Sequence, residues 1–142
     1  MESILVPIDG SAPSQRALEF VLRTWGGSPE LQVHLVNVQV PPPAEMVLEA
    51  AIAPVDWEAE AQKTGQEVID AACKAIDAAG QRYTATVCIG SPAEQIVARA
   101  RELGCTLIVM GTRGLSSLAS LVLGSVATRV IHAAHCPVTL VK

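Results

Sequence analysis

The feature of this sequence that most limits its fold is a regular alternation between short apolar runs and helix-like segments. The apolar runs, rich in Val, Ile and Leu, occupy residues 3–9, 30–40, 82–90, 105–111 and 136–142. Strands that alternate with helices in this way form βαβ units, in which each crossover returns the chain to the same end of the sheet. The alternation therefore predicts an α/β fold built on a parallel sheet.

The segments between the runs have the spacing and the boundary residues of helices. Apolar residues recur there at the steps of three and four that define a helix face. We expect helices over residues 15–25, 61–79, 91–103 and 126–134. Ser11 or Ser14 is a suitable N-cap for the first, and Ser91 followed by Pro92 begins the third. We predict one doubly wound domain over residues 1–142, with a five-stranded parallel sheet and helices on both faces.

The length and charge of the chain exclude several classes of protein. A chain of 142 residues, half of them hydrophobic, has the size and composition of one ordinary domain with a packed core. Its net charge of −4 argues against general nucleic-acid binding, which needs a basic surface. No basic-then-apolar leader opens the sequence, and no apolar run is long enough to span a bilayer. We therefore expect a cytoplasmic protein with no membrane partner.

The cysteines and histidines form no clear metal-binding pattern. The widely spaced cysteines, which we expect to be reduced and buried, are Cys73, Cys88, Cys105 and Cys136. His132, His135 and Cys136 are close in sequence and allow a zinc interpretation, but no second ligand pair has a zinc spacing. Histidines at a helix C-terminus, favoured by the helix dipole, explain the cluster more simply. His34 stands alone in a strand, where we expect it on a wetter face.

Two polar loops follow apolar runs at positions where doubly wound proteins bind ligands. Residues 9–11 (DGS) follow the first run, and residues 111–114 (GTRG) follow the fourth. Ligands bind outside the carboxyl ends of the strands, where the strand order reverses. If the first and fourth strands are neighbours, these loops face each other, and the end of the second strand, near residues 38–40, flanks the same crevice.

The stretch GTRGLSSLASLVLGS, residues 111–125, holds three glycines and ends on a serine. Gly111 and Gly114 let backbone N–H groups turn around an anion, and Gly124 with Ser125 begins a helix whose N-terminal donors favour phosphate. Arg113 is the nearest fixed positive charge. The same glycines also fit a packing interpretation, in which they end a strand, form a turn and allow a helix to pack closely on the sheet. The residues alone leave both interpretations open.

The spacing of these residues resembles the nucleotide-binding signature of the universal stress protein family, G-x2-G-x9-G-S/T. The opening residues ILVPIDGSAPSQRAL and the closing residues GSVATRVIHAAHCPVTLVK also resemble that family. The resemblance implies a five-stranded doubly wound fold of the adenine nucleotide alpha hydrolase-like type. Because all four signature positions are present, it further implies membership of the subgroup that binds ATP.

The resemblance also implies which residues contact the nucleotide. They are Pro7, Asp9, Val38, Met110, Gly111, Gly114, Gly124, Ser125 and Val126. Pro7 and Val38 are expected at adenine, Met110 and Gly111 beside the nucleoside, and the remaining glycines with Ser125 and Val126 at the phosphates. Asp9 is expected at the ribose or near a metal bound to the phosphates. An alternative for Asp9 is a turn-forming acid beside Ser11.

The implied ligand is ATP with Mg²⁺, and AMP or ADP are possible competitors. Many nucleotide-binding members have a Lys or Arg in the stretch where this chain has LSSLASLVL, so we expect modest affinity for the triphosphate or reliance on Mg²⁺. The sequence has neither GxxxxGKS/T nor GxGxxG after a strand, and no positioned nucleophile or base. We expect weak ATP hydrolysis at most.

The predicted function is that of a nucleotide-dependent sensor or regulator in stress response, acting through dimerisation and an unknown protein partner. A nucleotide-independent stress or interaction protein and a slow Mg²⁺-dependent ATPase are the alternatives. The last strand is short, apolar and expected at a sheet edge, and members of the family commonly dimerise through it. Val138, Leu140 and Val141 are therefore candidates for a two-fold contact. Residues 41–60 follow the second strand, a position that suits a flexible flap over the crevice.

Overall fold

A computed structural model describes residues 1–49, 56–112 and 123–142 of the chain. The described elements, in chain order, are β1 (Glu2–Pro7), α1 (Ala12–Trp25), β2 (Leu31–Gln39), α2 (Ala44–Glu49), α3 (Trp57–Ala78), β3 (Tyr83–Ile89), α4 (Pro92–Glu102), β4 (Leu107–Gly111), α5 (Ser125–Ala133) and β5 (Val138–Val141). The strands form one parallel sheet in the order β3-β2-β1-β4-β5. The predicted fold class is confirmed.

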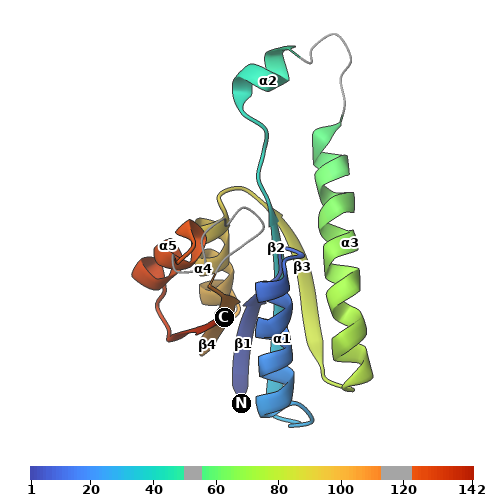
Figure 1. Cartoon of the computed structure of the whole chain (residues 1–142), viewed down its shortest axis with the longest axis vertical. Helices are drawn as coiled ribbons and strands as arrows, with labels where there is room; N and C mark the ends of the chain where they lie inside the picture. The colour runs from blue at the N-terminus through green and yellow to red at the C-terminus, as the bar shows by residue number, and fades with distance from the viewer. Residues whose placement is uncertain (50–55, 113–122) are drawn as a thin grey trace.

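Two apolar layers cover the two faces of the sheet, because successive strand residues point to opposite sides. Ile4 and Val6 of β1 pack with α1 and α3 in one layer. Leu5, between them in sequence, packs with α4 and α5 in the other. Figure 1 shows α4 and α5 to the left of the sheet and α3 to its right.

Local signals in the sequence set the beginnings of the helices. Of the two candidate caps for α1, Ser11 occupies the N-cap position, and its hydroxyl accepts a hydrogen bond from the backbone N–H of Ser14 at 3.3 Å. Ser91 precedes Pro92 at the start of α4, as predicted, although its side chain makes no capping hydrogen bond. Asp56 caps α3, which begins at Trp57, four residues earlier than predicted.

The region between β2 and α3 contains a helix that the sequence pattern did not indicate. Residues 44–49 form α2, and none of its residues is buried. Only the later part of α3 packs on the sheet, since its buried residues run from Gly65 to Ile76. α2 and the first turns of α3 therefore extend beyond the ends of the strands (Figure 1).

Two expectations about buried residues were wrong. His34 is only 7% exposed, because hydroxyl groups of neighbouring strands satisfy both of its ring nitrogens within the sheet. Of the four cysteines, which are all free thiols, only Cys105 is buried, and the other three are half-buried because they lie at the margins of the packed layers. Within the described ranges, no helix has the length and apolarity needed to cross a membrane.

Candidate functional site

The strand order reverses between β1 and β4, and this point defines the candidate site. β1 pairs with β4 on one side and with β2 on the other, so the condition under which the loops after β1 and β4 face each other is met. In parallel strands the carboxyl ends lie at the same edge of the sheet. The turn after β1, the end of β2 and the start of the loop after β4 therefore meet at one edge.

Asp9 forms a tight turn between β1 and α1. One carboxylate oxygen, Oδ1, accepts hydrogen bonds from the backbone N–H of Ser11, at 2.9 Å, and from the Ser11 hydroxyl. The turn is completed by Ser14, whose hydroxyl accepts from the Asp9 N–H and donates to the Ser11 carbonyl. Asp9 Oδ1 is thus the turn-forming acceptor that the alternative interpretation describes. Oδ2, in contrast, makes no hydrogen bond to any residue that the structure describes.

The amino terminus of α5 lies at the carboxyl end of β4. The N–H of Gly124 donates to the carbonyl of Thr112 at 2.8 Å, and the N–H of Thr112 donates to the carbonyl of Val141 at 3.0 Å. These two bonds join the start of α5 to the end of the β4–β5 ladder. The segment between Thr112 and Leu123, which includes Arg113 and Gly114, lies outside the described residues.

The first turn of α5 has the features of an anion-binding site. Gly124 is the N-cap in an extended conformation, and its carbonyl accepts the first helical hydrogen bond, from Thr128 at 3.0 Å. Within the described part of the chain, the N–H groups of Ser125, Val126 and Ala127 have no acceptor. The dipole of the helix adds a partial positive charge at this end. The arrangement suits an anion such as phosphate.

Gly111 has a packing role that does not depend on a ligand. A Cβ atom at this position would lie 2.7 Å from the Cβ of Pro13 and 2.8 Å from its carbonyl carbon. Glycine is therefore needed for α1 to approach β4. For Gly111 the geometry supports the packing interpretation, while Gly114 lies outside the described residues. The neighbouring Met110 is only 5% exposed, with its side chain in the layer under α4 and α5.

Pro7 and Val38 lie half-buried near the carboxyl ends of the adjacent strands β1 and β2. Next to Val38 in β2 is a buried polar residue that the sequence analysis did not single out. Asn37 is 2% exposed, and its Nδ2 donates to the carbonyl of Ile8 at 2.8 Å. Its Oδ1 accepts from Gln39 Nε2, also at 2.8 Å. The available signal was an asparagine between two valines in a predicted strand, because a buried amide needs partners.

The other polar groups with possible chemistry lie away from this edge. His34 Nδ1 is 2.7 Å from Thr84 Oγ1, and its Nε2 is 3.1 Å from Ser3 Oγ, so the ring bridges three strands in the body of the sheet. Burial, together with the charge of Arg99, lowers the pKa of His34 below its usual value. His132 and His135 are exposed, and no three metal-ligating side chains come together among the described residues.

Comparison with known proteins places the chain in a family. The model of the universal stress protein family matches residues 1–142. Universal stress protein MJ0531 of Methanocaldococcus jannaschii is 33% identical over 144 residues, which cover 99% of this chain and 82% of that protein.

Solved structures share the fold. The structure of protein MJ0577, also from M. jannaschii, has a TM-score of 0.85 at 26% identity and covers 99% of this chain and 95% of that one. The Archaeoglobus fulgidus universal stress protein, solved in complex with dAMP, has a TM-score of 0.69 at 23% identity and covers 100% of this chain and 98% of that one. Because the family model matches the chain over its whole length, the protein belongs to the universal stress protein family.

Proposed function

We propose that the protein binds an adenine nucleotide, ATP with Mg²⁺ in the first place, at the edge where β1 and β4 meet. The observation that supports this most directly is the amino terminus of α5, whose first N–H groups have no acceptor among the described residues and which the bond from Gly124 to Thr112 holds where the strand order reverses. Three backbone donors and the positive end of a helix dipole form a site for phosphate that needs no lysine. Such a site fits a chain whose signature loop has no basic residue in the stretch LSSLASLVL.

The residues at this edge are divided between the parts of the nucleotide. The backbone at Gly124, Ser125 and Val126 would hold the phosphates, with Gly114 and Arg113 from the loop. Pro7 and Val38 would contact adenine from the ends of β1 and β2. The side chain of Met110 is buried and Gly111 packs on Pro13, so these two residues would contribute through their backbone.

Asp9 would hold the ribose or a magnesium ion. Its Oδ1 is used by the turn, and its Oδ2 makes no hydrogen bond to a described residue. Mg²⁺ in nucleotide sites is bound by one or two carboxylates together with phosphate oxygens, so one free carboxylate oxygen suits it. When bound, the ion would neutralise phosphate charge beyond the single positive charge that Arg113 of the loop supplies.

The proposed outcome of binding is regulation rather than turnover. No nucleophile–base pair is evident in the sequence, and one oxygen of the Asp9 carboxylate accepts the hydrogen bonds of its turn. The nucleotide would therefore act as a signal read by protein partners in a stress response, with weak hydrolysis at most. The A. fulgidus universal stress protein, which shares this fold, was solved in complex with dAMP.

A homodimer through the free edge of β5 belongs to the same proposal. The carbonyls of Pro137 and Val141 accept hydrogen bonds from β4, so by the two-residue period of a strand the backbone groups of Thr139 also face β4. Those of Val138 and Leu140 then face the open edge. Strand pairing through these two residues, with Val141 beside them, would join two copies about a two-fold axis.

The test is calorimetric titration of nucleotide-free protein with ATP, ADP and AMP, with Mg²⁺ and with EDTA. We expect saturable binding of ATP that is stronger with Mg²⁺. In Asp9→Asn the amide oxygen can still accept from Ser11, so the turn is kept while the charge is lost, and the Mg²⁺ effect should shrink. Wild-type protein that binds none of the three nucleotides would refute the proposal. Phosphate release well above background would favour the ATPase alternative.

A further inference from the structure

The short helix α2 presents apolar side chains to solvent. Met46, Val47 and Leu48 are 60%, 46% and 77% exposed, and none of the residues of α2 is buried. Including Val40, residues 40–48 hold four of the six large hydrophobic side chains that are exposed in the described chain. A monomeric protein rarely concentrates exposed apolar residues in this way unless the surface meets a partner.

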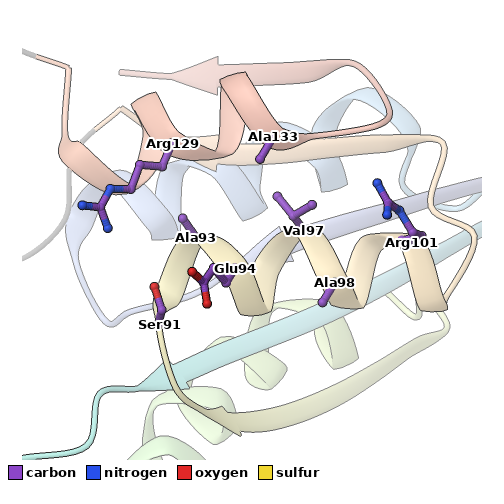
Figure 2. A pocket seen from close by; sticks show the side chains of 8 residues that line it. All are labelled: Ser91, Ala93, Glu94, Val97, Ala98, Arg101, Arg129 and Ala133. Carbon is purple, nitrogen blue, oxygen red and sulfur yellow. The ribbon is translucent and has the colours of Figure 1, made fainter.

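A groove between α4 and α5 is a second surface of interest. Its volume is about 580 Å³, and small apolar side chains line its length: Ala93, Val97, Ala98 and Ala133. Figure 2 shows the guanidinium groups of Arg129 and Arg101 at its opposite ends. Neither forms an ion pair, since the pair found among the described residues joins Arg99 to Glu102.

The charges of the two surfaces are complementary. Glu45 and Glu49 flank the apolar residues of α2, and residues 40–49 contain no Lys or Arg. The groove has two arginines against one carboxylate, Glu94, which lies in the first turn of α4, where the helix dipole favours it. An apolar helix with an acidic residue at each end therefore matches an apolar groove with a basic residue at each end.

We propose that α2 of one copy docks into the α4–α5 groove of a second copy of this chain. Within one chain the two surfaces do not meet, because residues 40–49, which we call the arm, project from the body of the molecule, and α2 at its end lies well away from α4 and α5 (Figure 1). A helix of six residues buries less surface than a stable complex needs. The contact is therefore made twice, each arm in the groove of the other copy, around a two-fold axis.

Charge reversal of full-length protein tests this pairing. Variant A is Glu45→Arg with Glu49→Arg, and variant B is Arg101→Glu with Arg129→Glu. All four side chains are exposed, so neither variant is expected to unfold. In A a basic arm faces a basic groove, and in B an acidic arm faces an acidic groove. In an equimolar mixture, each arm finds a groove of opposite charge on the other variant.

Molar mass is measured by light scattering over a range of concentrations. Wild-type protein should show an association step, and A or B alone should weaken its association constant by about tenfold or more. The equimolar mixture of A and B should restore the association constant of the wild type. Leu48→Ser, which removes an exposed apolar group and no charge, should weaken the step as well. None of these residues belongs to β5, so association through that strand is left in place.

Matched controls separate docking from net charge. Glu19→Arg with Glu67→Arg repeats the charge change of A on exposed positions of α1 and α3, and Lys63→Glu with Lys74→Glu repeats that of B. Neither control should alter the step. The proposal is overturned if A and B associate as the wild type does, or if their mixture stays as weak as each alone. It is also overturned if the wild type shows no step that A or B removes.

Discussion

Replacing Ser125 by proline would remove one backbone donor from the proposed phosphate site while keeping α5. Ser125 is the first residue of the helix, the position at which proline is best tolerated because its N–H has no helical partner. Gly124 before it has φ −63° and ψ 154°, the extended conformation that a residue before proline requires. The Ser125 side chain is exposed, so no packing is lost.

The expected loss follows from the bond that disappears. A hydrogen bond from a backbone N–H to a charged phosphate oxygen contributes about 1.5–3 kcal/mol. Its removal should raise the Kd for Mg²⁺·ATP by roughly 10- to 150-fold, at about 1.4 kcal/mol for each factor of ten. Ser125→Ala is the matched control, because it removes the hydroxyl and keeps the N–H. Its effect should be smaller.

Calorimetric titration of both variants with Mg²⁺·ATP and with adenosine provides the measurement. Circular dichroism and thermal unfolding should show that both remain folded. Adenosine has no phosphate, so its affinity should be unchanged in Ser125→Pro. If the proline variant bound ATP as tightly as Ser125→Ala does, the start of α5 would not be a phosphate site. Equal losses for ATP and adenosine would also contradict the reasoning, because they would point to a general disturbance of the fold.

Three further outcomes are expected. Because burial and Arg99 lower the pKa of His34 from 6.5, the unfolded chain takes up its proton at higher pH than the folded one. The contribution of neutral His34 to the free energy of unfolding should therefore be complete above pH 6.5 and be lost as the pH drops from there through the folded pKa. Urea unfolding at several pH values should show a smaller decline of this free energy for His34→Gln than for the wild type. A Cβ at Gly65 would lie 2.5 Å from Val87 Cγ1 and 2.8 Å from Asn37 Oδ1, so Gly65→Ala should destabilise by about 1–3 kcal/mol in urea unfolding, although alanine favours helices. A gain in stability would show that α3 shifts freely. In gel filtration, Leu140→Pro should lose the proposed association through β5, and Leu140→Ala, which keeps the outward N–H, should retain it. Equal behaviour of the two variants would count against strand pairing.

Much of the fold could be predicted from the sequence because strand and helix patterns are local. The apolar runs around Leu5, Val33 and Val109 marked strands without reference to any other part of the chain. Ser11 and the Ser91–Pro92 pair marked helix beginnings in the same way. α2 was missed because its large apolar residues, Met46, Val47 and Leu48, are consecutive and therefore lack the three-to-four spacing of a helix face. The candidate site was predicted from Asp9 after the first strand and from the spacing of Gly111, Gly114, Gly124 and Ser125, which resembles a family signature.

Only the tertiary structure decided which of these local features meet. The order β3-β2-β1-β4-β5 brought β1 beside β4, more than 100 positions later in the chain, and so placed Asp9 and the start of α5 at one edge. It also buried His34 between Ser3 and Thr84, and gave Gly111 a packing role against Pro13. A residue's own sequence neighbourhood sets its backbone conformation and the face it occupies. Its burial and its partners depend on surfaces far away in the chain, because close packing joins segments by shape and not by sequence order.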